Sequence, residues 1–265
     1  MTHIIVIANQ KGGVAKTTTT ASFAAALTRK GFHVLAVDMD PQGNLSDSVG
    51  ASMYDCPTAY ELLKNEVTAG QCIQHADAFD IIPANIMLAG AEQELSHTGK
   101  EYRLKERLSD IVGNYDYIII DTPPSLGILT VNAFTAAHTV IIPTTAGIFA
   151  AKGIQQLYNT VENVRRYCNP DITIAGILFT RYNPRAVISQ DVRALTEQLG
   201  NTMQATIYKT FIRNSVVVEE AQANQQDIFS YKNNTTVAED YDAFVKEYMK
   251  STNKTPATKK KERKG

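Results

Sequence analysis

The fold is decided by one stretch of sequence, Gln10-Lys11-Gly12-Gly13-Val14-Ala15-Lys16-Thr17-Thr18. The apolar run before it, His3 to Ala8, is dominated by β-branched residues and predicts a buried strand of a parallel sheet. Thr17 to Lys30 contains helix-favouring alanines and is followed by Gly31, which predicts a helix. A loop in this position directs backbone N–H groups and the positive end of the helix dipole at an anion. We therefore interpret the stretch as a phosphate-binding loop.

Two side chains of this loop have the chemistry that a nucleotide requires. Lys16 would reach the β- and γ-phosphates, and the Thr17 hydroxyl would ligate Mg2+. The usual pattern G-x-x-x-x-G-K-[ST] is not satisfied, because Gln10 and Ala15 occupy its two glycine positions. A second pattern fits instead, K-G-G-x-x-K-T, with an additional lysine, Lys11. The competing interpretation is a purely structural Gly-Gly turn, and the register of both lysines with the threonine argues against it.

Two further motifs place carboxylates at strand ends. A predicted strand over 33–37 leads into Asp38-Met39-Asp40-Pro41-Gln42-Gly43-Asn44, and a strand over 117–120 ends at Asp121. The carboxyl ends of parallel strands are where such sheets place their chemistry. The second motif is a Walker B pattern, so we expect Asp121 to contact Mg2+ through water and residues 122–127 to sense the γ-phosphate. For the first motif, taken alone, a capped turn is an equally good interpretation.

The three motifs, in this order, resemble those of the ParA/MinD family of deviant Walker A ATPases, and the resemblance covers about 250 of the 265 residues. In that family the first lysine crosses a dimer interface to the partner's nucleotide, which implies this role for Lys11. The family's V-D-x-D-P-Q-G-N segment implies that Asp40 positions or activates the attacking water and that Asp38 helps to hold the metal. Residues 212–214 and 220–222 resemble the family's C-terminal segment, which lies beside the nucleotide and near the DNA.

The resemblance implies an ATPase with ATP and Mg2+ as cofactors, hydrolysing ATP to ADP and phosphate weakly without a partner. The predicted catalytic residues are Lys11, Lys16 and Asp40. The predicted nucleotide-binding residues are Lys11, Gly12, Gly13, Val14, Ala15, Lys16, Thr17, Thr18, Arg213 and Asn214. The predicted metal ligands are Thr17, Asp38 and Asp121.

Strand and helix patterns alternate along the rest of the chain. The further predicted strands are 79–83, 139–143 and 172–180. The further predicted helices are 58–64 with Thr58 as N-cap, 92–112, 153–167, 186–199 closed by Gly200, 218–223 and 237–250. This alternation predicts one α/β domain over residues 1–250, with a doubly wound, mainly parallel sheet covered by helices on both faces, a P-loop NTPase. Residues 251–265 are polar and basic, and we expect a disordered tail.

Composition indicates a soluble, globular protein, because 44% of the residues are hydrophobic and 20% are charged. No apolar run approaches the roughly 18 residues that span a bilayer. A strand that begins by residue 3 leaves no room for a signal peptide. The three cysteines, Cys56, Cys72 and Cys168, are far apart and favour a reducing compartment over a disulfide framework or a zinc site. We expect a cytoplasmic protein in which His75 and His97 are surface residues.

Charge is unevenly distributed. The chain has a net charge of −1, yet residues 250–265 hold seven basic residues against one acid and carry +6, which leaves −7 for residues 1–249. Any contact with DNA must therefore be concentrated in a local patch or in the tail. The candidates are Arg181, Arg185, Arg193, Lys209, Arg213, Lys232, Lys259, Lys260 and Lys261. Many family members have a basic residue just after the R-N pair, where this chain has residues 215–218, Ser-Val-Val-Val.

The resemblance is strongest to short DNA partition ATPases of the ParA/Soj type. It implies that ATP and Mg2+ join two subunits into a homodimer, that the dimer binds DNA non-specifically on the nucleoid, and that a ParB-like centromere-binding protein stimulates hydrolysis and release. Only nine residues precede Gln10, so operator-specific repression is not expected.

The alternative is a MinD-like positioning ATPase, which would use a C-terminal amphipathic helix as a reversible membrane anchor. The last predicted helix has an apolar face, but its aromatic residues indicate core packing, so no stable membrane insertion is expected. An electron-transfer protein like the nitrogenase iron protein would need cysteines near the switch segments. A bacterial tyrosine kinase would need a terminal tyrosine cluster, and the sequence fits neither.

Overall fold

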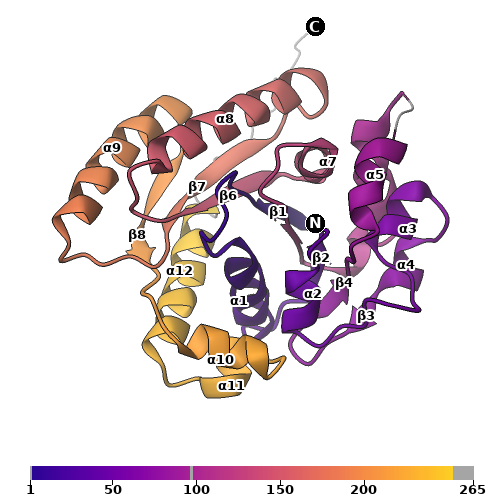
Figure 1. The fold of residues 1–265 in the computed structure, drawn as a ribbon, viewed down its shortest axis with the longest axis horizontal. Coiled ribbons are helices and arrows are strands. Elements are labelled where there is room, and N and C mark those ends of the chain that lie inside the picture. Colours follow the sequence, from indigo (N-terminus) through magenta and orange to yellow (C-terminus); the bar gives the residue numbers. More distant parts are fainter. Residues whose placement is uncertain (1, 96–97, 253–265) are drawn as a thin grey trace, which may run out of the picture.

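The computed structural model describes residues 2–95 and 98–252, which form an eight-stranded sheet in the order β3-β4-β2-β5-β1-β6-β7-β8 (Figure 1). The strands are β1 His3–Ile7, β2 Val34–Asp38, β3 Gln74–His75, β4 Asp80–Ile82, β5 Tyr117–Asp121, β6 Thr139–Thr144, β7 Thr173–Phe179 and β8 Thr206–Phe211. β3 pairs antiparallel with β4, and the other neighbouring strands are parallel. The predicted doubly wound, mainly parallel sheet is confirmed.

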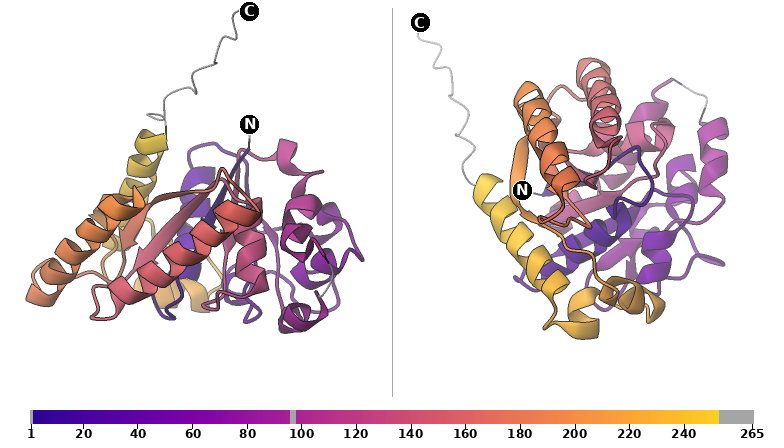
Figure 2. Two further views of the ribbon diagram at one scale, coloured as in Figure 1. Left: turned by 90° about the horizontal axis from the view of Figure 1, so that it is seen from above. Right: turned by 60° about the vertical axis from the view of Figure 1, so that its left-hand side comes forward.

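Helices connect the strands and cover both faces of the sheet (Figures 1 and 2). The longer ones are α1 Lys16–Thr28, α7 Ile128–Ala136, α8 Ala150–Tyr167, α9 Val187–Met203 and α12 Thr236–Thr252. The shorter ones are α2 Asn44–Ser48, α3 Ala59–Lys64, α4 Ala69–Cys72, α5 Leu88–Glu94, α6 Arg103–Leu108, α10 Val217–Ala223 and α11 Ile228–Lys232. Two 3₁₀ turns, η1 Lys100–Tyr102 and η2 Val112–Asn114, flank α6.

The alternation of side chains along β1 shows how one strand serves two cores. Ile4 and Val6 point into the core formed with α3, α5, α6, α7 and α8, whereas Ile5 and Ile7 point into the core formed with α1, α11 and α12. A strand buried on both faces needs an apolar residue at every position, which is why this run is continuous rather than alternating. Each such side chain contributes about 1.5–3 kcal/mol on burial.

The apolar face of α12 is part of the second core. Tyr241, Phe244, Val245 and Tyr248 are fully buried, and Tyr248 meets Phe23 of α1 edge to face at 5.1 Å between ring centroids. Figure 2 shows α12 lying along the outer side of α1. The predicted packing role of this helix is therefore confirmed. Within residues 2–95 and 98–252, no helix has both the length and the hydropathy that a membrane crossing requires.

Two helix predictions were wrong. The predicted helix 92–112 is interrupted, because α5 ends at Glu94 and α6 begins only at Arg103, after a turn in which Gly99 has a φ of +81°. The helix 186–199 was expected to stop at Gly200, but α9 continues to Met203 and is closed by Gln204, which has a φ of +53°. The first prediction rested on a charged, periodic sequence. The second took Gly200 as a stop signal, although a single glycine is tolerated inside a helix.

Other local predictions are confirmed. Thr58 caps α3 in a capping box with Glu61. His75 is exposed and contacts Asp80, and the three cysteines are free thiols. His97, like residues 253–265 of the predicted tail, lies outside the described residues, and α12 takes in the first two residues that were assigned to the tail.

Candidate nucleotide-binding site

Three strands end side by side at the carboxyl edge of the sheet. The parallel register places Ile7 of β1 and Asp38 of β2 opposite Asp121, the last residue of β5. The segments that follow these strands are the phosphate-binding loop after β1, the turn over residues 38–44 after β2, and residues 122–127 after β5, which are predicted to sense the γ-phosphate. Strand pairing therefore brings together the three motifs that lie far apart in the sequence.

The phosphate-binding loop passes through two residues with positive φ, Gly13 at 71° and Ala15 at 60°. Ala15 is the N-cap of α1 and makes no side-chain cap, so the first N–H groups of the helix are left for another acceptor. The left-handed conformation of an alanine costs roughly 1–2 kcal/mol and is typical of a functional loop. Thr180, after β7, supports the loop by donating a hydrogen bond from Oγ1 to the Val14 carbonyl oxygen at 3.0 Å.

Lys16 is buried at the start of α1 with its ammonium group curled back over the loop. Its Nζ donates to the Lys11 carbonyl oxygen at 3.4 Å, a long and weak contact. Burial lowers the pKa of Lys16, and the nearby carboxylates of Asp121 and Asp40 partly oppose this shift. A buried cation with this little compensation suits an incoming phosphate anion.

Thr17 and Asp121, two of the predicted Mg2+ ligands, lie next to each other in the site. The Thr17 hydroxyl donates to Asp121 Oδ2 at 2.7 Å, and the Thr20 hydroxyl donates to Asp121 Oδ1 at 3.1 Å. Asp121 is fully buried, and burial together with the Asp38 carboxylate raises its pKa to about 7. A divalent cation would favour the ionised carboxylate. A hydroxyl and a carboxylate beside a phosphate site fit Mg2+, which takes one or two carboxylates plus phosphate oxygens.

Asp38 holds the turn that carries Asp40. The Asp38 carboxylate is buried and accepts hydrogen bonds from Ser46 N (3.0 Å), Ser46 Oγ (2.7 Å) and Asp40 N (3.1 Å). Burial raises its pKa to about 6. Asp40 itself accepts from Gln42 N at 3.0 Å and faces the cleft that Lys16 also lines. The structure thus gives Asp38 a positioning contact with Asp40, beside the metal role that the resemblance implies.

Lys11 lies at the surface, outside the cleft. Its backbone N–H donates to Asn9 Oδ1 at 2.9 Å, and Asn9 is anchored in turn by a 2.7 Å hydrogen bond to the Pro143 carbonyl oxygen. The Lys11 Nζ lies against Gly147, where an added Cβ would be 3.2 Å away. Lys11 is therefore an exposed cation beside the phosphate-binding loop.

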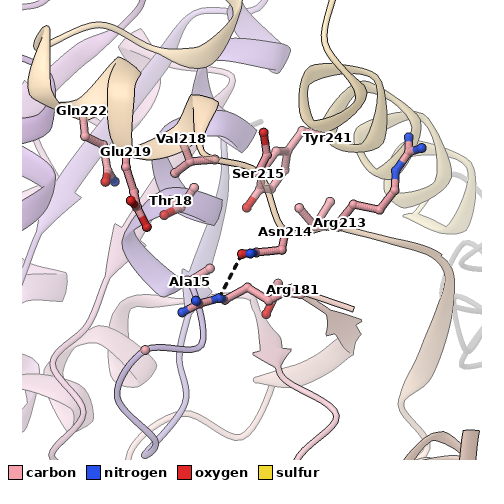
Figure 3. A pocket seen from close by; sticks show the side chains of 13 residues that line it. Ala15, Thr18, Arg181, Arg213, Asn214, Ser215, Val218, Glu219, Gln222 and Tyr241 are labelled. Carbon is pink, nitrogen blue, oxygen red and sulfur yellow. Dashed lines mark hydrogen bonds between the residues drawn. The ribbon is translucent and has the colours of Figure 1, made fainter. Parts of the chain in front are cut away.

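A second cavity adjoins the loop on the side of α10 and α12 (Figure 3). Its lining residues include Thr18, Arg181, Asn214, Glu219, Gln222 and Tyr241. Gly13, Ala15 and Gln222 line both this cavity and the cleft that contains Lys16 and Asp40. The two spaces therefore share one wall, and a nucleotide could place its phosphates in the cleft and its nucleoside in the cavity.

The side chains of the predicted nucleotide-binding residues Arg213 and Asn214 point in different directions. The Asn214 side chain lies in the cavity, where its Oδ1 accepts a 3.2 Å hydrogen bond from Arg181 Nε (Figure 3). The Arg213 guanidinium turns away and binds Asp240 of α12, with Nη2 at 2.6 Å from Oδ1 and Nε at 2.9 Å from Oδ2. Its predicted contact with a nucleotide stays a prediction, and the observed partner is a carboxylate.

The predicted DNA-binding residues differ in their surroundings. Arg181 lines the cavity beside the phosphate-binding loop. Arg193 contacts Glu197, the Tyr208 carbonyl oxygen and the ring of Phe179. Arg181 is exposed, as are the other described candidates, Arg185, Lys209, Arg213 and Lys232. Lys259, Lys260 and Lys261 lie outside the described residues.

Sequence reasoning missed several residues that shape the site. Thr20, Ser46 and Thr180 each hold a functional segment through a buried hydroxyl. Thr20 could have been found, because it lies one helical turn after Lys16 and on the same face. Thr180 has no local signal, since its partner Val14 is 166 positions away, and Ser46 contacts Asp38 across eight positions of a turn that no periodic pattern covers.

This arrangement defines the class of protein: a P-loop nucleotide-binding protein with a doubly wound sheet and a carboxylate-rich site at the carboxyl edge of its strands. A family profile described as an AAA domain matches residues 2–174. The sporulation initiation inhibitor protein Soj of Bacillus subtilis is 41% identical over 251 residues, covering 93% of this chain and 98% of that protein. The chain belongs to the ParA/Soj family of deviant Walker A ATPases, as its motifs predict.

Two further similarities extend over most of the chain. The chromosome partitioning protein ParA of Myxococcus xanthus is 37% identical, covering 96% of this chain and 90% of that protein. The crystal structure of cobyrinic acid a,c-diamide synthase from Mycobacterium smegmatis, with bound ADP and magnesium, has a TM-score of 0.83 and 36% identity, covering 96% of each chain. The same protein has also been solved with an ATP analogue and magnesium.

Proposed function

We propose that this chain is an ATP-dependent DNA partition ATPase that acts in the segregation of a plasmid or chromosome. The observation that carries the proposal is the convergence of Lys16, Thr17, Asp40 and Asp121 at one edge of the sheet, with Lys11 exposed beside them. The cofactors are ATP and Mg2+, and the similar protein has been solved with ADP and magnesium and with an ATP analogue and magnesium.

Each residue has a proposed task that follows from its position. The N–H groups at the start of α1 bind the phosphates, and Lys16 neutralises their charge. Thr17 and Asp121 would hold Mg2+, whose chemistry is to offset the charge that develops on the phosphate oxygens. Asp40 orients the attacking water, and the three hydrogen bonds to Asp38 keep the turn in place.

The dimer is proposed from the exposure of Lys11. Two nucleotides that face each other bring strong negative charge into one interface, and a lysine from each subunit offsets it. The dimer binds DNA non-specifically on the nucleoid, and a ParB-like centromere-binding protein stimulates hydrolysis and release. Membrane anchoring through α12 is not proposed, because Tyr241, Phe244 and Tyr248 of its apolar face are fully buried in the core.

The proposal is tested by measuring binding to random-sequence DNA with ATP, with ADP and without nucleotide, and by sedimentation with anionic liposomes. We expect salt-sensitive DNA binding only with ATP, and no binding to liposomes at equal protein concentration. DNA binding that is indifferent to nucleotide, or binding to liposomes alone, would contradict the proposed function.

A further inference from the structure

Asp240, near the start of α12, makes three hydrogen bonds to one residue of the segment that follows β8. Its Oδ2 accepts from the Arg213 backbone N–H at 2.9 Å and from Arg213 Nε at 2.9 Å, and its Oδ1 accepts from Nη2 at 2.6 Å. Asp240 is only 9% exposed, and charge-assisted bonds of this kind are strong where water is scarce. The carboxylate therefore holds both the main chain and the side chain of Arg213.

A main chain that is held at Arg213 also restricts the direction of the next residue, because a planar peptide unit joins the two. Figure 3 shows the result: the Arg213 side chain points toward α12, and the Asn214 side chain points into the cavity beside the phosphate-binding loop. If Arg213 were released, the segment could rotate and carry the Asn214 amide out of the cavity.

Asn214 is held from its other side by Arg181. Arg181 Nε donates to Asn214 Oδ1 at 3.2 Å. A guanidinium has only donors, so this bond fixes the orientation of the amide, with Oδ1 toward Arg181 and Nδ2 as its donor end. Arg181 has a φ of +49°, a conformation that non-glycine residues adopt mainly at functional sites. The residue before it, Thr180, is bonded to the Val14 carbonyl oxygen, so this second contact leads back to the phosphate-binding loop.

The next residue of α12 lines the same cavity. Tyr241 is fully buried, and its hydroxyl lies 3.2 Å from Thr19 Oγ1 in α1, the helix that follows the phosphate-binding loop. Two consecutive residues of α12 thus contact two sides of the cavity: Asp240 contacts the segment that carries Asn214, and Tyr241 contacts α1. The position of α12 therefore sets the shape of the cavity.

We infer that Asp240 is a positioning residue for the nucleotide, because its carboxylate holds Arg213 so that the Asn214 amide faces the nucleoside. Asp240 acts through Asn214 and need not touch the nucleotide itself. The inference rests on the proposed function, since it requires a nucleotide whose phosphates lie in the cleft and whose nucleoside lies in the cavity.

The test compares two ligands, ATP and tripolyphosphate, each with Mg2+, because tripolyphosphate has the phosphates and no nucleoside. Isothermal titration calorimetry measures their binding to the full chain. We expect Asp240→Ala to bind ATP about tenfold more weakly than the wild type, the loss that corresponds to the hydrogen bonds of one misdirected amide. Tripolyphosphate should bind the variant and the wild type equally well, because the phosphate-binding loop is unchanged.

Steady-state hydrolysis gives a second readout that general damage to the site would not reproduce. The KM for ATP should rise about tenfold in Asp240→Ala, while kcat at saturating ATP stays unchanged. This pattern is expected when a substitution weakens binding of the substrate and of the transition state equally. A fall in kcat with an unchanged KM would overturn the inference.

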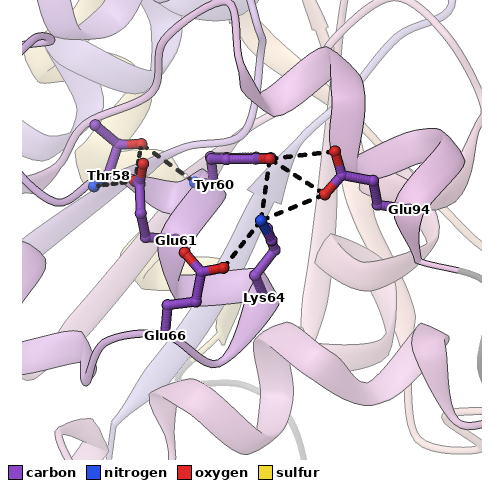
Figure 4. A network of polar contacts seen from close by, with 6 residues as sticks. All are labelled: Thr58, Tyr60, Glu61, Lys64, Glu66 and Glu94. Atoms are coloured by element: carbon purple, nitrogen blue, oxygen red, sulfur yellow. Dashed lines mark hydrogen bonds and ion pairs between the residues drawn. The ribbon is translucent and has the colours of Figure 1, made fainter.

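Two matched controls remove carboxylates that lie outside the cavity. Asp242→Ala removes another acid of α12, whose partners are two surface lysines. Glu94→Ala removes a carboxylate that, like Asp240, joins two elements: Glu94 of α5 accepts from the Tyr60 hydroxyl of α3 at 3.1 Å and lies 3.5 Å from Lys64 Nζ (Figure 4). Both controls should bind ATP and tripolyphosphate as the wild type does.

Asp240→Asn keeps the size of the side chain and an acceptor for the Arg213 N–H, so it provides a test if Asp240→Ala does not fold. We expect it to bind ATP about threefold more weakly than the wild type and tripolyphosphate equally well. Wild-type affinity for ATP in either variant would overturn the inference. An equal loss of affinity for both ligands would also overturn it, because Asp240 would then support the whole site.

The same measurements on the wild type separate this inference from the proposed function. A wild type that binds neither ligand would contradict the proposed function. A wild type that binds both ligands with equal affinity would overturn the inference alone, because the nucleoside would then contribute nothing to binding.

Discussion

Thr17 and Asp121 are joined by a hydrogen bond of 2.7 Å, from the Thr17 hydroxyl to Asp121 Oδ2, although 104 positions separate them in the sequence. The bond connects the first turn of α1 with the end of β5. It places the two predicted Mg2+ ligands side by side, within reach of one ion.

Replacing Lys16 with alanine should abolish ATP binding. The variant removes the buried cation at the phosphate-binding loop, and charge-assisted hydrogen bonds contribute about 1.5–3 kcal/mol each. Two lost phosphate contacts correspond to an affinity at least about 100-fold weaker. Isothermal titration calorimetry with ATP and Mg2+ measures the change. Wild-type affinity would remove the basis for a nucleotide site.

Replacing Asp40 with alanine should leave ATP binding intact and slow hydrolysis by about 10²–10⁴-fold, the usual contribution of a positioned acid or base. Because the nucleotide would persist, the variant should accumulate as an ATP-bound dimer. Light scattering detects the doubled mass, and phosphate release measures turnover. Normal turnover in the variant would show that another group orients the water.

Replacing Lys11 with alanine or glutamine should leave ATP binding by the monomer largely unchanged and prevent dimer formation. The side chain is exposed and makes no contact with the cleft, so its removal should not disturb the loop. Sedimentation velocity with ATP and Mg2+ compares the variant with Asp40→Ala as a positive control for dimers. Dimers of wild-type stability would mean that Lys11 is an ordinary loop residue.

Asp121 should make the nucleotide-free protein less stable as the pH rises. Its pKa is raised from 3.8 to about 7, so between these values the folded state binds a proton that the unfolded state has released. The free energy of unfolding then falls with pH in that window, by up to about 1.4 kcal/mol per pH unit for this group. Urea unfolding at pH 5 and pH 7 measures the slope.

The control for this pH dependence is Asp121→Asn, which removes the titrating group and should have a flatter profile than the wild type. Mg2+ with ATP should oppose the loss of stability in the wild type, because a cation favours the ionised carboxylate. Parallel profiles for the two proteins would show that Asp121 does not titrate in this range.

Removing residues 253–265 should weaken binding of the ATP dimer to DNA and reduce its dependence on salt. The segment contains six basic residues, and each phosphate contact that is lost flattens the log–log salt dependence by about 0.9. The truncation leaves α12 complete, so ATP hydrolysis without DNA should be unchanged. An unaltered slope would place the DNA-binding surface on the folded part of the chain.

Much of the site could be predicted from local sequence because its groups lie at the ends of strands. Lys16, Thr17, Asp38, Asp40 and Asp121 each belong to a motif in which an apolar strand is followed at once by a polar loop. Pairing of the strands is enough to bring these side chains together, since the carboxyl ends of parallel strands all lie at the same edge of the sheet. The expected strands and most expected helices were found for the same reason.

The contacts of the predicted DNA-binding residues could not be read from the sequence. Arg181 contacts Asn214 and Arg193 contacts Glu197, and their proposed contact with DNA stays a prediction. The contact of Arg213 with Asp240 of α12 could not be predicted either, and the proposed role of Arg213 at the nucleotide stays a prediction. A basic side chain reaches several ångströms from its backbone, so its partner depends on which element packs opposite it.

The sequence by itself determined the fold class, the phosphate-binding loop and the carboxylates at the ends of β2 and β5, because each is specified by residues that are neighbours in the chain. Only the tertiary structure decided the strand order, the hydrogen bond between Thr17 and Asp121, the direction of the Arg213 side chain and the hydrogen bond from the Arg213 backbone to Asp240. These features join segments that are distant in sequence, and they follow from packing around two shared cores, which no local pattern encodes.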